Sequence, residues 1–252
     1  MVYIETMRTV VLFTRSPEAE ARAKGLPRKA GARLFRALLD SWCRSARTAG
    51  VRVALMAPAG QVAALAARYA AEGVRVEAQR GDTFAARLED ALDRAFRAGA
   101  APVLLAGGDS PAPRPAALAQ VLDQLAAAPD RVVLGPSPDG GVNCIGLSCP
   151  APELLAGVPW TSAAVDAALR ARAAALGLDV RVLPEVLDVD RHADVARAHA
   201  LAGSTLAWRA LRHALAAYLG LLPAAAPLPP PPRPLRAALL RARDPPAGAS
   251  CR

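Results

Sequence analysis

Carboxylates follow apolar runs at three places in this sequence. Asp109 lies in VLLAGGDSP, Asp139 in GPSPDGG, and Asp188 and Asp190 in LDVD. Ligands of open α/β sheets bind at the carboxyl ends of the strands. Carboxylate oxygens there suit a hard cation such as Mg²⁺ or Mn²⁺. The pattern therefore predicts a polar, cation-assisted site at one edge of a sheet, although Asp109 before Ser-Pro also suits an ordinary turn or helix cap.

Glycines flank two of these carboxylates. Gly107 and Gly108 let the chain turn sharply before Asp109 and let a ligand approach its backbone. Gly140 and Gly141 follow Asp139 directly, and a turn so rich in glycine often admits a ligand. These four glycines are therefore candidate binding residues.

The third acidic segment carries two carboxylates, Asp188 and Asp190, with one residue between them. In an extended segment both side chains project to the same side and could share a cation. Asp190 also precedes RHADVARAHAL, where it could instead be the N-cap of a helix. Both interpretations stay open at this point.

A basic stretch follows the first apolar run, TVVLFT. Cations after a strand are typical of a phosphate site, although a solvated basic loop would look the same. The motifs GxxxxGK[ST] and GxGxxG are both missing from this stretch. The candidate cations are Arg15, Arg22, Lys24, Arg28 and Lys29.

Taken together, these residues favour transfer at a diphosphate. Cations and a divalent ion would neutralise the phosphates, and the metal would stabilise the departing oxyanion. No compelling Ser-His-Asp order is present.

Short apolar runs alternate with segments of helical periodicity, which predicts an α/β fold with a mostly parallel sheet. The predicted strands cover residues 9–14, 51–56, 74–78, 103–106, 131–134 and 180–183. The predicted helices cover residues 32–49, 60–72 and 83–98, a segment from 115, and two stretches within 151–176. In the first helix, Leu34, Leu38, Leu39, Trp42 and Cys43 should face the core.

Composition narrows the class of protein. The 252 residues carry a net charge of +9, which favours anionic partners. Basic residues do not cluster with aromatic ones, so we expect no nucleic-acid partner. The four cysteines lack the spacing of a zinc site or of a disulfide framework. With no signal peptide and no run long enough to span a membrane, a cytoplasmic protein is expected.

The character of the chain changes near residue 203. We expect a main domain over residues 1–203, an amphipathic helix over 204–222 and a proline-rich basic tail over 223–252, which its composition predicts to be disordered. The helix should dock on the main domain, although weak contact with a membrane surface is an alternative.

The segments FTRSPEAEARAKG, LLAGGDSPAPRPAAL, LGPSPDGGVNCIGL, VPWTS and LDVDRHADV together resemble the DUF2064 family. The resemblance covers roughly residues 9–200. That family belongs to the GT-A superfamily of nucleotide-diphospho-sugar transferases and includes proteins described as glycosyltransferases of the SpcE-like and arsenosugar-biosynthesis types. The resemblance implies a GT-A three-layer sandwich, a divalent metal at Asp109, and a phosphate-facing basic loop.

On this basis we expect a metal-dependent transferase that acts on a nucleotide-diphosphate sugar and a small-molecule acceptor. The expected metal ligands are Asp109, Asp188 and Asp190, and the expected catalytic residues are Asp139 and Asp190. Arg15, Lys24, Gly107 and Gly108 are assigned to the nucleotide phosphates. Gly140, Gly141 and Trp160 are assigned to the substrate.

Two alternatives accompany this expectation. The first is a nucleotidyltransferase that consumes a nucleoside triphosphate and releases pyrophosphate, since the superfamily also contains such enzymes. The second is an inactive binding or scaffold homologue. It is motivated by the altered loop, where Gly25-Leu26 replaces the family's Thr-Arg pair, and by the proline-rich tail. A second departure from the family's pattern is that Val142-Asn143 replaces two tyrosines.

Overall fold

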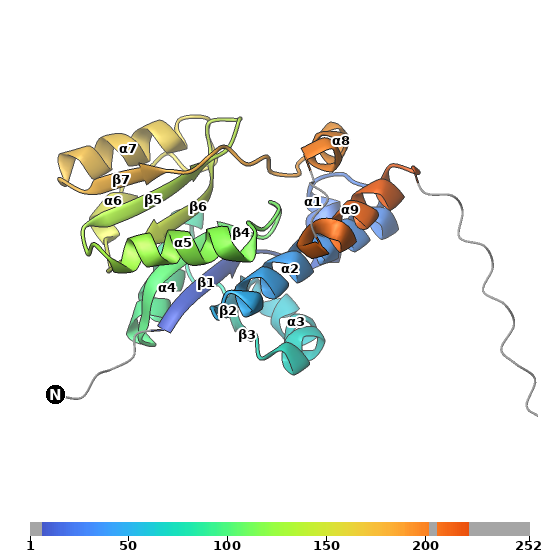
Figure 1. The fold of residues 1–252 in the computed structure, drawn as a ribbon, viewed down its shortest axis with the longest axis horizontal. Helices are drawn as coiled ribbons and strands as arrows, with labels where there is room; N and C mark the ends of the chain where they lie inside the picture. Colours follow the sequence, from blue (N-terminus) through green and yellow to red (C-terminus); the bar gives the residue numbers. More distant parts are fainter. Residues whose placement is uncertain (1–6, 202–205, 222–252) are drawn as a thin grey trace, which may run out of the picture. The chain divides into compact units, whose positions relative to one another are not determined.

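The computed structural model describes residues 7–201 and 206–221. In this part of the chain, seven strands form one sheet in the order β3-β2-β1-β4-β6-β5-β7 (Figure 1). The strands are β1 (Met7–Phe13), β2 (Arg52–Ala57), β3 (Arg75–Ala78), β4 (Ala100–Gly107), β5 (Arg131–Pro136), β6 (Val142–Leu147) and β7 (Asp179–Val182). The strand that leads to Asp109 is thus the central one.

The strand register decides where the site forms. β1 and β4 are parallel, with Phe13 opposite Gly107, so both strands end at the same level. β6 runs antiparallel to both β4 and β5. The beginning of β6 therefore lies at the same edge as the ends of β1, β4 and β5. The expected mostly parallel sheet is confirmed, while β6 is a strand that the sequence analysis did not predict.

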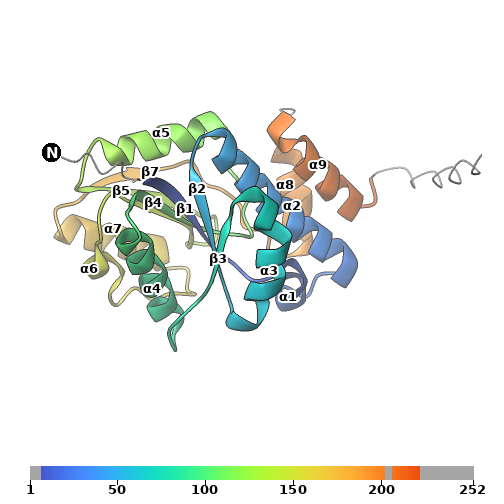
Figure 2. The ribbon, with the colours of Figure 1, turned by 90° about the horizontal axis from the view of Figure 1, so that it is seen from below.

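Helices cover both faces of the sheet. They are α1 (Pro17–Ala23), α2 (Arg28–Thr48), α3 (Val62–Tyr69), α4 (Phe84–Arg97), α5 (Pro115–Ala126), α6 (Pro152–Leu155), α7 (Val165–Ala175), α8 (His192–Leu201) and α9 (Leu206–Tyr218), with short 3₁₀ helices at Ala59–Gln61 and Ala70–Glu72. α2, α3 and α5 share a core with one face, and α4, α6 and α7 share a core with the other. Figure 2 shows α5 on one side of the sheet and α4, α6 and α7 on the other. The predicted three-layer α/β fold is confirmed.

The first long helix behaves as its periodicity predicts. The five apolar side chains expected to face the core, Leu34, Leu38, Leu39, Trp42 and Cys43, are all at most 2% exposed in α2. Trp42 also donates a hydrogen bond through Nε1 to the carbonyl of Ser110, 2.9 Å away. α2 is therefore tied directly to the segment that carries Asp109.

The stretch predicted as a basic loop, residues 15–31, is instead largely helical. Ser16 caps α1, with Oγ accepting from the amide of Ala19 at 3.3 Å, and Pro17 occupies the first turn. α1 packs so closely on α2 that a Cβ on Gly31 would lie 2.8 Å from that of Ala21. The loop prediction was wrong because Pro17 and the glycines read as breakers, whereas they begin a helix and permit close packing.

The C-terminal helix docks on the main body. Leu211 and Leu215 of α9 are buried in a cluster that includes Leu34 and Leu38 of α2. Figure 1 shows α9 lying alongside α2. None of the helices within the described residues has the length and hydrophobicity to cross a bilayer. Residues 223–252 lie outside the described residues, so the proposed division into three parts stays a prediction.

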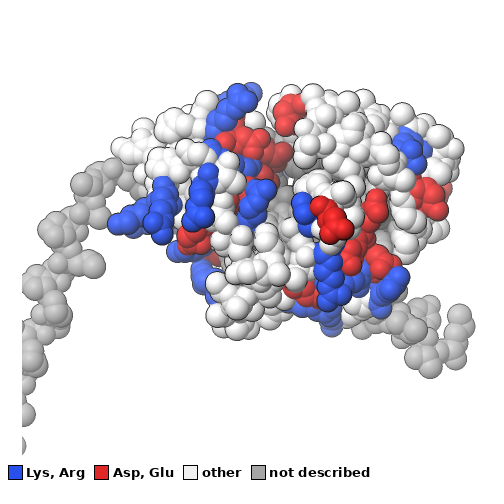
Figure 3. Space-filling view, turned by 180° about the vertical axis from the view of Figure 1, so that it is seen from behind, with Lys and Arg blue, Asp and Glu red and all other residues white. Residues whose placement is uncertain are grey.

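Many positive side chains lie beside negative ones. On the face that Figure 3 shows, Lys and Arg side chains lie in small groups, several with Asp or Glu beside them. Among the ion pairs of the described residues, Arg68 lies 3.2 Å from Asp40 and Arg97 lies 3.0 Å from Asp93. Exposed pairs of this kind add little to stability.

Replacing Leu215 by Ala tests the docking of α9. The side chain is fully buried, so we expect the free energy of unfolding, measured by urea titration, to fall by about 2–5 kcal/mol. Leu221→Ala is the matched control, because that leucine is 61% exposed and its truncation should change stability by less than about 0.5 kcal/mol. Equal stability of the two variants would contradict the packing described here.

Candidate active site

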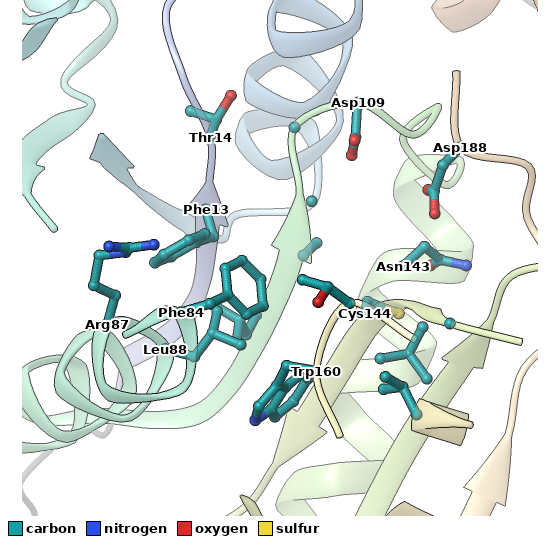
Figure 4. A pocket seen from close by; sticks show the side chains of 18 of the residues that line it. Phe13, Thr14, Phe84, Arg87, Leu88, Asp109, Asn143, Cys144, Trp160 and Asp188 are labelled. Atoms are coloured by element: carbon teal, nitrogen blue, oxygen red, sulfur yellow. The ribbon is translucent and has the colours of Figure 1, made fainter. Parts of the chain in front are cut away.

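A large pocket opens at the edge of the sheet where β1, β4 and β6 meet. Its volume is about 730 Å³. The ends of β1 and β4, the beginning of β6, the turn that holds Asp139, and the first turns of α4 all contribute to its wall (Figure 4). This pocket, called the main pocket below, therefore lies at the carboxyl-end location predicted for the site.

Asp109 and Asp188 form the acidic side of this pocket. The amide of Val189 donates to the carbonyl of Asp109 at 3.1 Å, and the Val189 side chain is fully buried. This anchor holds the LDVD segment against the end of β4. Two carboxylates about 80 residues apart in the chain thus face the same cavity (Figure 4).

Asp188 is unusual in its surroundings. Ser137 donates to its Oδ2 at 2.7 Å, while its Oδ1 is buried without a hydrogen-bond partner. Burial, and next the nearby charge of Asp109, raise the pKa of Asp188 to about 7. An unpartnered buried carboxylate oxygen beside a second carboxylate is where a cation would be favourable.

Lys24 lies between Asp109 and Asp190. Its Nζ donates to a carboxylate oxygen of each, and Glu20 lies 3.6 Å away. Burial alone would lower the pKa of Lys24, but the charges of Asp109 and Asp190 outweigh it and raise that pKa above the usual value. Lys24, Asp109 and Asp190, three of the predicted site residues, are thus brought together as one charged cluster.

The other predicted cations divide into two groups. Arg15 lines the pocket and contacts both oxygens of Glu20, at 3.2 and 3.3 Å. Burial, and then the charge of Asp109, raise the pKa of Glu20. Arg22, Arg28 and Lys29 are exposed and do not line the pocket, because α1 and α2 turn them toward solvent.

At three of the four predicted glycines, a Cβ would come closer than 3.0 Å to another atom. A Cβ on Gly108 would collide with the Thr14 hydroxyl, and one on Gly107 would lie 2.6 Å from Oδ1 of Asp109. Gly140 has a φ of +86°, and a Cβ there would collide with the carbonyl of Ala163. Gly141 donates its amide to Oδ1 of Asp139 at 2.9 Å. The glycines shape the acidic turns at the pocket edge.

Aromatic side chains form the opposite wall. Phe84 contacts Phe13 and Trp160 edge to face, with centroids 5.6 and 5.9 Å apart. Trp160 was predicted to lie at the substrate site and does line the pocket. Phe13 and Phe84 were missed, because Phe13 reads as a strand residue and Phe84 as the start of a helix.

Two polar side chains were also missed by the sequence analysis. Asn143 lines the pocket and donates through Nδ2 to the carbonyl of Pro136 at 3.0 Å. Gln79 donates to the carbonyls of Thr14 and Met56, at 3.0 and 2.8 Å, and so joins the ends of β1 and β2. The signal for Asn143 was its polar side chain within an apolar run, directly after the DGG turn.

A smaller cavity of about 260 Å³ adjoins the acidic side. It shares Asp139 and Asp188 with the main pocket and adds Asp190 and two exposed arginines, Arg191 and Arg197. Asp194 accepts the amides of Asp190 and Arg191, at 3.2 and 2.8 Å. Asp194, not Asp190, therefore caps the start of α8 with its side chain.

The acidic side of the pocket is suited to a divalent cation. Asp109 and Asp188 in the main pocket, and Asp190 in the smaller cavity, carry carboxylate oxygens, the type of ligand that Mg²⁺ and Mn²⁺ prefer. Over the described residues, no group of three or more acidic, His or Cys side chains is already arranged as a metal site. The unpartnered Oδ1 of Asp188 is nevertheless an available ligand.

Comparisons with known proteins agree with this fold. Residues 41–162 match the family described as "Uncharacterized protein conserved in bacteria (DUF2064)". Over these residues the chain is similar to the DUF2064 family, as the resemblance predicts. No curated protein matches this chain.

Solved structures extend the comparison beyond the family. A protein from Desulfovibrio desulfuricans G20, provisionally assigned as a nucleotide-diphospho-sugar transferase, is 22% identical with a TM-score of 0.74, over 85% of this chain and 96% of that one. A nucleotidyl transferase from Methanothermobacter thermautotrophicus is 18% identical, with a TM-score of 0.52 over 76% and 95%. The Mycobacterium tuberculosis H37Rv protein Rv0371c, solved in complex with manganese, is 24% identical, with a TM-score of 0.50 over 76% and 97%. At these identities the chain shares their fold.

Asp188→Asn tests the buried carboxylate. The pKa of Asp188 is higher in the folded protein, about 7 against 3.8, so its contribution to stability is complete below pH 4 and is lost as the pH rises toward 7. The free energy of unfolding is measured by urea titration at pH 4 and at pH 8, in buffer with a chelator. Between these pH values the variant should lose less of it than the wild type does, by up to a few kcal/mol. The exposed Asp130→Asn is the control, and parallel pH profiles for all three proteins would contradict the assignment.

Proposed function

We propose that this protein is a divalent-metal-dependent transferase that moves a sugar from a nucleotide-diphosphate sugar to a small-molecule acceptor. The observation that carries the proposal is the buried Oδ1 of Asp188, which lacks a partner beside Asp109 at the edge of a 730 Å³ pocket. The pocket has room for a ligand the size of a nucleotide sugar. The fold shared with the Desulfovibrio protein supports this choice of substrate.

In this proposal Asp109, Asp188 and Asp190 hold the metal. Bound there, a divalent cation would neutralise the diphosphate and stabilise the oxyanion that leaves with the nucleotide. The manganese complex of the Mycobacterium tuberculosis protein supports Mn²⁺ as the first ion to test. Lys24, held by two of the same carboxylates, adds positive charge at that position.

The remaining roles follow the walls of the pocket. The backbone at Gly107 and Gly108 can approach the phosphates closely, and Arg15 adds charge next to them. Trp160 and Gly141 line the pocket and would bound the substrate side, and Gly140 lies in the same turn as Gly141. An ionised Asp139 or Asp190 could accept the proton of the acceptor hydroxyl as its oxygen forms the new bond to the sugar and the sugar–phosphate bond breaks.

A nucleotidyltransferase is the second candidate. The fold shared with the Methanothermobacter nucleotidyl transferase favours it. The same acidic centre could then assist attack on the α-phosphate of a nucleoside triphosphate, with pyrophosphate as the product. The preferred nucleotide separates the two reactions.

Thermal unfolding with Mn²⁺ is the first measurement. The panel contains UDP-, GDP-, dTDP- and CDP-sugars and the free nucleoside triphosphates. A ligand at about 100 times its Kd stabilises the folded state by about 2.7 kcal/mol, which raises the Tm by roughly 5–10 °C. We expect a metal-dependent increase with one nucleotide sugar, while a preference for a triphosphate would favour the nucleotidyltransferase.

The matched variants are Asp109→Asn and Asp123→Asn. Asp109→Asn should abolish the metal-dependent increase, whereas Asp123, an exposed residue on α5, should be replaceable without effect on it. If the Asp109 variant responds as the wild type does, the metal assignment fails. If no nucleotide stabilises the wild type, the inactive homologue becomes the better description.

A further inference from the structure

One cation in the wall of the main pocket has no counter-ion within the described residues. Arg87 projects from α4 and lines the pocket. Its Nε is buried and has no hydrogen-bond partner, and its guanidinium takes part in none of the ion pairs found within residues 7–201 and 206–221. The side chain is only partly buried as a whole, so the rest of the guanidinium can be reached from the pocket.

Two other arginines of α4 differ from Arg87, because both form ion pairs. On the same helix, Arg94 pairs with Glu77 and Asp90, and Arg97 pairs with Asp93. A guanidinium stays charged at every physiological pH, and removing it from water without an anion costs free energy. Arg87 is thus a charged group in the pocket wall with no ion-pair partner within the described residues.

Within the described residues, three of the four buried side-chain polar atoms without partners belong to residues that line this pocket. They are Arg87 Nε, Trp160 Nε1 and Asp188 Oδ1. Buried polar groups in folded proteins are almost always hydrogen-bonded. Their concentration around one cavity points to a ligand with polar groups at more than one end.

The structure holds Arg87 in position on the aromatic side. A Cβ on Gly81 would lie 2.9 Å from the amide nitrogen of Arg87, so the turn before α4 packs directly against the first turns of that helix. Figure 4 shows Arg87 on the far side of Phe13 and Phe84 from Asp109 and Asp188. The cation and the acidic centre therefore face different parts of a bound ligand.

Building on the proposed function, we propose that Arg87 binds an anionic group of the substrate other than the diphosphate. The group is a carboxylate or a phosphate, since both match the planar fork of a guanidinium. It would belong to the transferred sugar or to the acceptor, whose uncharged part would pack on Phe13, Phe84 and Trp160. The substrates are then acidic at a second position, as in a uronic acid or a phosphorylated alcohol.

The test uses small anions and protein free of nucleotide and metal. Thermal unfolding is compared in sodium phosphate, sodium acetate and sodium chloride at equal ionic strength. At about ten times its Kd, a bound anion should raise the wild-type Tm by roughly 2–4 °C over chloride. If phosphate raises the Tm more than acetate does, the substrate is assigned a phosphate group. If acetate raises it more, the substrate is assigned a carboxylate.

The decisive comparison is between Arg87→Gln and Arg97→Gln. Phosphate also stabilises proteins in general by exclusion from their surface, and both variants share that effect. We expect Arg87→Gln to lose the additional increase and Arg97→Gln, whose arginine is 79% exposed on the same helix, to retain it. If Arg87→Gln does not fold, Arg87→Lys takes its place in the comparison. This variant keeps the positive charge but lacks the planar guanidinium, so it should retain only part of the additional increase in Tm.

Equal increases in the Arg87 and Arg97 variants, or no increase in the wild type, would overturn the proposal. Asp109→Asn separates it from the proposed function. This variant should lose the response to Mn²⁺ with a nucleotide but keep the response to the small anion. A wild type that responds to the anion and to no nucleotide would leave the anion site standing without the transferase assignment.

Discussion

Two carboxylates facing one cavity are the constraint on which the rest of the site depends. The buried side chain of Val189 and its amide bond to the Asp109 carbonyl hold Asp188 at the end of β4. The protein offsets the resulting repulsion with the hydrogen bond from Ser137 and the ammonium of Lys24. A raised pKa of Asp188 and an unpartnered oxygen remain, and both favour a cation.

The scaffold around this centre is built to bring distant segments to one edge of the sheet. Parallel pairing of β1 with β4 ends both strands at the same level, and the antiparallel β6 returns Asn143 to that edge. Lys24, at the end of α1, donates to Asp109, although the two residues are 85 positions apart in the sequence. The charged and aromatic walls thus come from separate elements, so a ligand that contacts both would bridge them.

Charge is distributed unevenly between the two walls. On the acidic side Asp109, Asp188 and Asp190 each lie near another charge, and Lys24 and Arg15 are both paired within the chain. On the aromatic side Arg87 has no such partner within the described residues. The proposed ligand has a diphosphate, neutralised by a cation, at one end and a second anionic group at the other. The first group would contact the acidic wall and the second would contact Arg87, so the two proposals concern different groups in one pocket.

The sequence by itself determined the α/β class, the core face of α2 and the acidic positions at strand ends, because hydrophobic periodicity and glycine-flanked carboxylates are local signals. It missed α1 and β6, since Pro17 reads as a helix breaker and the run after the DGG turn is interrupted by Asn143. It also could not show that Lys24 pairs with Asp109 and Asp190, or that Arg87 lacks a partner. Only the tertiary structure decided those relations, because Coulombic interaction depends on distance in space, and the register of the sheet sets which distant charges become neighbours.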